Sequence, residues 1–325
     1  MTVVVLTEDC DPAVDAVITE LARREVPVFR ADTAWFPLRM SLAARLVGGR
    51  YWSGRLDTRH REVDLAGVRS VWYRRPTAFE LPEGLSGPER QHALWEARYG
   101  LGGVLADLPV LWVNHPGVEA DVSYKPVQLA TAVRCELDVP ATLITNRPDE
   151  VRAFAAEYGP VVVKSLAYAS VFEDGVGKAL YTHALSSDDL AELSGVASTA
   201  HLLQRFVADK AFEARVTVVG DRVFAAAIHA GSDAARVDWR ADQAALTFTV
   251  VEVPGTVKAG IHRFMRALRL QFAAFDFVID YAGTWWFLEC NSAGQYGFVE
   301  AATGLPITSA MAELLASGLM EKGKP

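Results

Sequence analysis

The stretch DFVIDYAGTWWFLECNSAGQ, residues 276–295, carries oxygen-bearing side chains at spacings that suit a metal ion. An Ala-Gly pair separates two runs of aromatic and branched residues, which predicts a hairpin with a two-residue turn. In that register Asp276 lies opposite Glu289, and Asn291 shares the face of Glu289 because side chains alternate along a strand. Carboxylates that face each other on a sheet repel, so we expect either a cation or a shared proton between them.

These three side chains predict a magnesium site. Mg²⁺ usually takes one or two carboxylates from the protein and completes its octahedron with water and substrate phosphates. The alternative is a solvated hairpin with scattered acids, but Phe277, Leu288 and Cys290 make the other face apolar, which indicates a buried sheet. Asp280 lies about 13 Å along the strand from Asp276, so we leave it out of the site.

Two lysines occupy positions that suit contact with an anion. Pro126 favours the first turn of a helix that runs to about Glu136, so Lys125 lies at the positive end of that helix. Lys164 closes a strand of branched residues, and the loop LAYASVFEDGVG follows it closely. The alternative for Lys164 is an ammonium group that simply extends into solvent from a strand end.

A further acid and two further cations follow. Gly220 and Asp221 predict a tight turn between two strands, and the first of these strands carries Glu213 and Arg215 on one face. The alternative for this pair is a weak surface ion pair. Later in the chain, the segment VDWR places Arg240 in a polar loop.

The elements that must position these residues predict an α/β protein. The N-terminal part reads as an open α/β layer, and its first loop lacks the GxGxxG pattern of a dinucleotide site. Asn146 is expected to cap a helix that Gly159 ends. The expected elements are strands at Val3–Leu6, Val26–Arg30, Val68–Arg74 and Thr142–Ile144, exposed strands within 41–66, and helices after Asp11-Pro12, over 88–106 and over Val257–Leu268.

Length and composition fit an enzyme with more than one core. At 325 residues, 51% of them hydrophobic, the chain exceeds the size at which a single core stops growing. A net charge of −8 argues against nucleic-acid binding. No apolar run approaches the roughly 20 residues of a membrane span, so we expect a cytoplasmic protein with no membrane partner. Cys10, Cys135 and Cys290 lack disulfide or zinc spacing and are expected to be buried.

The order and spacing of these parts resemble the ATP-grasp superfamily across nearly the whole chain. The resemblance implies an ATP-grasp fold with α+β sandwich lobes behind an N-terminal open α/β domain. It divides the chain into a pre-ATP-grasp domain (1–117), a central lid domain (118–200) and a C-terminal catalytic domain (201–325).

The resemblance also implies ATP and Mg²⁺ as cofactors and gives each residue a role. Asp276, Glu289 and Asn291 match the magnesium triad. The residues matched to the nucleotide are Lys125 and Lys164 at the phosphates, Gln204, Arg205, Phe206 and Val207 in the hinge beside adenine, Glu213 near the ribose, and Arg215 and Arg240 at the γ-phosphate or the acyl-phosphate formed from it.

Within the superfamily, the phrases VWYRRP, EARVTVVGDRVFAAAI, VDWR and FLECNSAGQYGFVEAATGLPI resemble microviridin-type graspetide synthetases, the ATP-grasp ribosomal peptide maturases. These enzymes join Asp or Glu side chains to Ser, Thr or Lys of a precursor peptide through ω-ester or ω-amide bonds. The resemblance implies a partner peptide with a leader and such a core, and a homodimer. Arg74 and Arg75 of VWYRRP are candidates for contact with the substrate, although alternation points them to opposite faces.

Two other functions remain open. One is a ligase of the same fold that joins an amino acid to a small molecule or a protein tail, as glutathione-synthetase-like and ribosomal-protein glutamate ligases do. The other is a non-catalytic module that binds a nucleotide or a leader peptide, for which the intact set of metal-binding side chains gives poor support.

Overall fold

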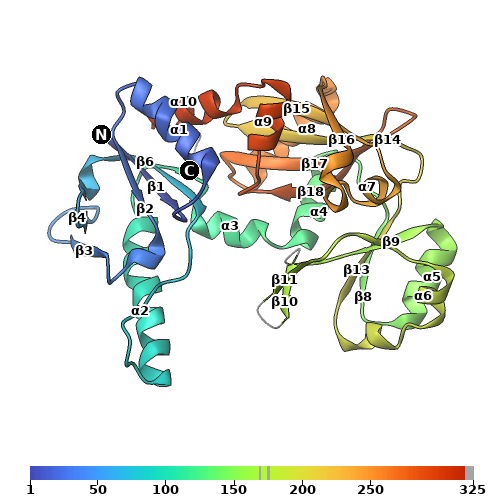
Figure 1. Cartoon of the computed structure of the whole chain (residues 1–325), viewed down its shortest axis with the longest axis horizontal. Helices are drawn as coiled ribbons and strands as arrows, with labels where there is room; N and C mark the ends of the chain where they lie inside the picture. The colour runs from blue at the N-terminus through green and yellow to red at the C-terminus, as the bar shows by residue number, and fades with distance from the viewer. Residues whose placement is uncertain (168–169, 174–175, 319–325) are drawn as a thin grey trace.

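The computed structural model describes residues 1–167, 170–173 and 176–318. Within these residues the strands form one five-stranded, two four-stranded, one three-stranded and one two-stranded sheet, and helices pack around them (Figure 1). The α/β class expected from the sequence is confirmed. Of the helices in these ranges, none has the length and apolar character needed to cross a membrane.

The N-terminal residues form an open parallel sheet in the order β2-β1-β6-β7. Asp11 caps α1 by accepting hydrogen bonds from two backbone N–H groups, with proline next in the chain. Helix α2 and the small sheet β3-β4-β5 share a core with one face of this sheet. The elements are β1 (Thr2–Thr7), α1 (Pro12–Arg23), β2 (Val28–Ala31), β3 (Met40–Arg45), β4 (Ser53–Thr58), β5 (Glu62–Asp64), β6 (Val68–Arg75), α2 (Gly87–Ala106) and β7 (Leu111–Val113).

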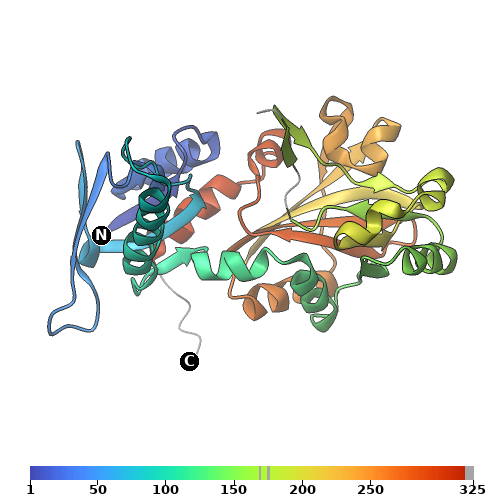
Figure 2. The ribbon, with the colours of Figure 1, turned by 90° about the horizontal axis from the view of Figure 1, so that it is seen from below.

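The middle of the chain contains an antiparallel sheet in the order β12-β9-β13-β8, whose apolar face packs against α5 (Figure 2). Strand β13 belongs to this sheet and begins just after the domain division expected at residue 200. The elements are α3 (Pro116–Val122), α4 (Lys125–Arg134), β8 (Thr142–Thr145), α5 (Pro148–Tyr158), β9 (Val161–Lys164), β10 (Ser170–Glu173), β11 (Val176–Ala179), β12 (His183–Ala184), α6 (Ser187–Ala191) and β13 (His201–Arg205).

Two local expectations in this region were wrong. The residue that caps α5 is Arg147, not Asn146, because Pro148 at the first helical position forces an extended conformation on the residue before it. The segment after Lys164 is not only a loop, since β10 and β11 pair as an antiparallel hairpin within it. Residues 168–169 and 174–175 of that segment lie outside the described residues.

The C-terminal part is built on an antiparallel sheet in the order β16-β15-β14-β17-β18. One face of β14, β17 and β18 is apolar and packs against α4 and α8, where the Phe264 ring lies 5.2 Å from Phe275 and 5.6 Å from Phe287. Strand alternation therefore turns the charged residues to the opposite face. The elements are β14 (Lys210–Val219), β15 (Arg222–Ala230), α7 (Asp233–Val237), β16 (Leu246–Val250), α8 (Gly255–Ala267), β17 (Phe272–Asp280), β18 (Trp285–Asn291), α9 (Gly297–Thr303) and α10 (Ile307–Ser317).

The connection between β17 and β18 is longer than the expected two-residue turn. Residues 281–284 form it, and Gly283 adopts a positive φ of 84°, which favours glycine. Asp280 stabilises the connection by accepting hydrogen bonds from the Thr284 N–H and from Trp286 Nε1, each at 2.8 Å. Asp280 thus has a structural role outside the charged site.

A bulge compensates for the different turn. The pairing of β17 with β18 shifts by one residue between Asp276 and Phe277. Beyond the bulge, Asp276 lies opposite Glu289, so the expected pairing of the two carboxylates is confirmed.

Helix α10 connects the two ends of the chain. It packs against α1 and β6, and the Ser70 hydroxyl donates to the Leu315 carbonyl at 2.8 Å (Figure 1). Buried residues of the N-terminal sheet and the five-stranded sheet form one continuous core around this helix. The N-terminal sheet is therefore fixed against the C-terminal part.

The cysteine expectation holds for two of the three residues. Cys135 and Cys290 are buried, and burial raises the pKa of both thiols. Cys10 is exposed in the connection between β1 and α1, so the expectation for that residue was wrong.

The phenylalanine cluster beneath the five-stranded sheet predicts a large stability effect. Phe287 is fully buried against three other rings, so Phe287→Ala should lower the free energy of unfolding by about 3–5 kcal/mol. Tyr281→Ala, at the exposed tip of the same hairpin, should change it by no more than about 0.5 kcal/mol. Urea denaturation measures both, and equal effects would contradict this description of the core.

Candidate active site

A row of charged side chains crosses the five-stranded sheet. Arg215 on β14 pairs in register with Asp276 on β17, which pairs with Glu289 on β18. Arg215 Nη1 donates to both carboxylate oxygens of Asp276, at 2.8 and 2.7 Å, and both side chains are buried. The sheet thus brings together the two carboxylates expected from the sequence and places a guanidinium beside them.

Asn291 is the last residue of β18 and lies two positions beyond Glu289, on the same face of the strand. Its backbone pairs in register with Ala274, and its side-chain Oδ1 accepts a hydrogen bond from the Ala293 N–H at 3.2 Å. The amide therefore stands at the exposed end of the charged row.

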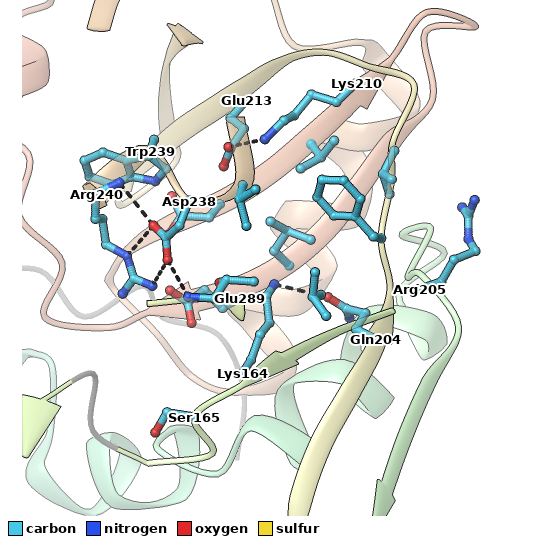
Figure 3. Close-up of a pocket in the computed structure, with 18 of the residues that line it drawn as sticks. Lys164, Ser165, Gln204, Arg205, Lys210, Glu213, Asp238, Trp239, Arg240 and Glu289 are labelled. Carbon is cyan, nitrogen blue, oxygen red and sulfur yellow. Dashed lines mark hydrogen bonds and ion pairs between the residues drawn. The ribbon is translucent and has the colours of Figure 1, made fainter. Parts of the chain in front are cut away.

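Two lysines face this row from the middle part of the chain. Lys164, at the end of β9, donates to Gln204 Oε1 at 3.1 Å, and its ammonium points into the pocket (Figure 3). Lys125, the first residue of α4, lies 3.1 Å from Glu289 Oε2 and donates to the Ser165 carbonyl at 2.7 Å. Lys164 therefore does not extend into solvent, and its alternative as a solvated strand end was wrong.

Burial and charge act against each other in this site. Burial raises the pKa of Asp276, and Glu289 adds to this effect while Arg215 opposes it. Burial acts on Glu289 in the same sense, but Lys125 and Lys164 outweigh it and lower the pKa of that carboxyl. Burial lowers the pKa of Lys164. An anion beside the lysines and a cation beside the carboxylates would each favour the charged forms.

Glu213 lies on the same face of β14 as Arg215, as expected. The two do not form a surface ion pair, because Glu213 is buried and accepts a hydrogen bond from Lys210 Nζ at 2.7 Å. Burial raises the pKa of Glu213, against the charge of Lys210. The side chains of Glu213 and Lys210 line the pocket (Figure 3).

The carboxylate of Asp238 holds the guanidinium of Arg240. Arg240 Nε donates to Asp238 Oδ1 at 2.9 Å, and Arg240 Nη2 donates to Oδ2 at 2.5 Å. The Thr182 N–H donates to Oδ2 at 2.9 Å, which connects the segment before β12 to the same carboxylate. Trp239 stacks on Phe298 of α9, with ring centroids 5.5 Å apart. The Arg240 side chain is thereby held at the pocket while it stays about one-third exposed.

The expected hinge lines the pocket beside Lys164. Gln204 is buried in β13 and donates to Thr142 Oγ1 at 3.0 Å, and Val207 is also buried. The guanidinium carbon of Arg205 lies 4.8 Å from the centre of the Trp286 ring. The expected residues that line the pocket are Lys125, Lys164, Gln204, Arg205, Phe206, Val207, Glu213, Arg240, Asp276 and Glu289.

Four expected residues lie outside that lining. Arg215 holds Asp276 from the neighbouring strand, and Asn291 lies at the exposed end of the charged row. Arg74 and Arg75 end β6, where its pairing with β1 shifts by one residue, so simple alternation does not describe how they face. Arg75 is exposed, whereas Arg74 is buried and donates to Gln295 Oε1 at 2.9 Å and to main-chain carbonyls beside it. The structure therefore does not bring either residue to the pocket.

Sequence reasoning missed Lys210, Asp238 and Gly294. An aspartate two residues before Arg240 was a usable signal, because such a side chain commonly accepts from the backbone N–H at the start of a turn. Gly294 has a steric role, since an added Cβ would lie 2.5 Å from Ala274 Cβ and 2.9 Å from Arg215 Nη2. A single sequence gave no sign of that close approach.

The donor set fits a magnesium ion that is shared with a substrate. In the described part of the chain, no group of three or more His, Cys, Asp or Glu side chains forms a metal site by itself. Two facing carboxylates and one amide oxygen instead suit an ion that takes its other ligands from phosphates and water. Asp276, Glu289 and Asn291 would hold such an ion, and Arg215 and Lys125 lie against the two carboxylates and offset their charge.

Asp238 predicts a pH-dependent contribution to stability. Burial opposes its ionisation, but hydrogen bonds from Arg240 and the Thr182 N–H lower its pKa to about 2, against about 3.9 for an ordinary aspartate. Because the folded pKa is the lower one, the ionised group stabilises the fold above about pH 4 and loses this effect as the pH falls to about 2.

Asp238→Asn should therefore reduce the free energy of unfolding at neutral pH. The difference in this free energy between variant and wild type should shrink as the pH falls from about 4 to about 2. Urea denaturation at a series of pH values measures this. A difference that stays constant down to about pH 2 would show that the lowered pKa is incorrect.

Two known family models match this chain. The MvdD pre-ATP grasp domain matches residues 2–119, and the RimK-like ATP-grasp domain matches residues 122–315. A search of curated proteins found no match.

Several solved structures are similar over the full length. A Chryseobacterium gregarium RiPP-associated ATP-grasp ligase, in complex with ADP and a leader and core peptide, is 26% identical with a TM-score of 0.89, covering 98% of this chain and 97% of its own. The macrocyclase MdnC from Microcystis aeruginosa MRC, bound with precursor peptide MdnA, is 26% identical with a TM-score of 0.84 and coverage of 97% and 99%. The macrocyclase MdnB from the same organism is 28% identical with a TM-score of 0.79 and coverage of 98% and 99%.

The resemblance expected from the sequence and the fold that it implied are both confirmed. The two family matches meet between residues 119 and 122, where the N-terminal sheet ends and α3 leads into α4. The chain belongs to the RimK-like ATP-grasp family and carries an N-terminal MvdD-type pre-ATP-grasp domain.

Proposed function

We propose that the protein is an ATP-dependent ligase that activates Asp or Glu side chains of a ribosomal precursor peptide and joins them to Ser, Thr or Lys as ω-esters or ω-amides. The observation that carries the proposal is the row of Arg215, Asp276 and Glu289, faced by Lys125 and Lys164 across one pocket. Full-length similarity to a RiPP-associated ligase solved with a leader and core peptide, and to a macrocyclase bound with its precursor peptide, supports the choice of substrate.

The first step transfers the γ-phosphoryl group of ATP to a carboxylate. A carboxylate oxygen of the peptide forms a bond to phosphorus while the bond to ADP breaks, which gives an acyl-phosphate. The two lysines hold phosphate oxygens and offset the repulsion between the anions. A bound Mg²⁺ would neutralise phosphate charge beside Asp276 and Glu289.

In the second step a hydroxyl or amine attacks the acyl carbon, the bond to phosphate breaks, and phosphate and a proton are released. We assign the two arginines different roles in this chemistry. Arg215 is buried and committed to Asp276, so it orients that carboxylate. Arg240 is partly exposed at the pocket, so it stabilises negative charge on the reacting group.

The proton acceptor for the second step is unassigned. Among the described residues that line the pocket there is no histidine. His229, on β15, contacts Thr249 Oγ1 at 3.1 Å and is not part of that lining.

The assignment of Lys164 predicts a specific loss of nucleotide affinity. A charge-assisted hydrogen bond contributes about 1.5–3 kcal/mol, so Lys164→Met should weaken binding of a non-hydrolysable ATP analogue by roughly 10–100-fold. Lys258→Met, on the exposed side of α8, serves as the matched control and should leave binding unchanged. Calorimetry measures both affinities, and equal affinities for the two variants would rule out this role for Lys164.

The peptide function predicts a defined mass change. Incubation of the protein with its precursor and Mg-ATP should lower the peptide mass by one water for each ring closed and release ADP and phosphate. Asp276→Asn should abolish both products, because it removes one of the facing carboxylates. Mass spectrometry with a coupled ADP assay follows both, and product formed at the wild-type rate by Asp276→Asn would refute the site assignment.

The same assay separates the alternatives. A ligase that adds an amino acid to a small molecule or protein tail would raise the acceptor mass while it consumes ATP. A non-catalytic binding module would bind nucleotide or leader and change no mass. Assembly as a homodimer and location in the cytoplasm stay predictions.

A further inference from the structure

The segment that follows the candidate metal ligand Asn291 is held by the N-terminal part of the chain. Residues 292–295, here named the strap, connect the end of β18 to α9. Hydrogen bonds reach the strap from β6 and from the residues around the start of α3, all of which precede the five-stranded sheet in the chain. The strap is thus a direct physical link between the N-terminal domain and the charged row.

Arg74 makes most of these contacts. Its Nη1 donates to the carbonyls of Ala293 and Gly294, the latter at 3.0 Å, and its Nη2 donates to Gln295 Oε1 at 2.9 Å. The buried carboxylate of Asp11 lies 3.4 Å from Arg74 Nε and supplies the counter-charge. A guanidinium directs its donors in a fixed fork, so several bonds from one such group fix both the position and the orientation of the strap.

Two further side chains hold the start of the strap. Asn114 Nδ2 donates to the Ser292 carbonyl at 2.9 Å, while its Oδ1 accepts from the Phe272 N–H at 3.1 Å at the beginning of β17. Glu119 accepts a hydrogen bond from the Ser292 hydroxyl. Asn114 therefore ties the strap to the strand that carries Asp276.

From the other side the strap packs against the charged row itself. Arg215, which holds Asp276, also donates from Nη2 to the Gln295 carbonyl at 3.0 Å. Gly294 fits only because it lacks a side chain next to Ala274 and Arg215. The strap is therefore held between two guanidinium groups, Arg74 of the N-terminal sheet and Arg215 of the five-stranded sheet.

We propose that Arg74 is a positioning residue that holds the strap, and thereby sets where Asn291 meets the metal ion. A buried guanidinium needs both a counter-charge and hydrogen-bond acceptors. Asp11 supplies the charge, and the carbonyls and the side chain that accept hydrogen bonds from Arg74 all belong to the strap. Groups that orient metal ligands from outside the ligand set typically contribute 10–100-fold in metal affinity. The proposal rests on the magnesium-nucleotide site of the proposed function and not on its peptide chemistry.

The test compares Arg74→Lys with Arg75→Lys, at the exposed residue that follows it in the same strand. Lysine keeps a positive charge beside Asp11 but lacks the fork that reaches three acceptors. In Arg74→Lys we expect the Mg²⁺ concentration that supports half-maximal AMP-PNP binding to rise roughly 10–100-fold, with affinity restored at saturating Mg²⁺. We expect faster amide hydrogen exchange in peptides that cover the strap. Arg75→Lys should match the wild type in both measurements.

A second variant guards against misfolding of the first. Ser292→Ala removes only the hydrogen bond to Glu119 and should change both readouts in the same direction by a smaller amount. If Arg74→Lys folds with unchanged Mg²⁺ dependence and unchanged exchange, the role of Arg74 is overturned while the proposed function stands. If the wild type binds AMP-PNP equally well without Mg²⁺, the metal site fails and the proposal for Arg74 fails with it.

Discussion

The structure depends on one electrostatic constraint, which is that two carboxylates face each other on adjacent strands of a largely buried sheet. Asp276 and Glu289 repel, and burial makes that repulsion stronger than it would be in water. Cationic side chains from three different elements offset this repulsion. They are Arg215 from the neighbouring strand, Lys125 from the start of a helix and Lys164 from the facing sheet. A metal cation together with a polyphosphate matches this charge pattern. The cation would neutralise the two carboxylates, and the polyphosphate would neutralise the two lysines.

The two sides of the site belong to different hydrophobic cores, one beneath the carboxylates and one beneath Lys164. The phenylalanine cluster under β17 and β18 fixes the strands that carry the carboxylates. The sheet with Lys164 has its own core around α5, and Lys164 faces the row across the pocket. Asp238 contacts both sides of the pocket, because it accepts from Thr182 near β12 while it holds Arg240. Such a contact suits a site that must exclude water from the proposed acyl-phosphate.

Much of this arrangement follows from period-two alternation, which depends only on local sequence. It placed Glu213 with Arg215 on one face. The pairing of Asp276 with Glu289 was correct although the predicted turn was wrong, because a bulge cancels the extra length of the connection. What sequence reasoning missed depends on distant contacts. The burial of Arg74 requires acceptors at Ala293 and Gly294, and no local pattern in VWYRRP reports where those carbonyls lie.

The position of a divalent ion bound with nucleotide would show directly whether the facing carboxylates form the metal site. Crystals grown with Mn²⁺ and AMP-PNP allow the ion to be located by its anomalous scattering. We expect a peak within coordination distance of Asp276, Glu289 and Asn291, with phosphate oxygens completing the coordination shell of the ion. A nucleotide bound in the pocket with the Mn²⁺ peak absent there, or located away from these three residues, would contradict this expectation.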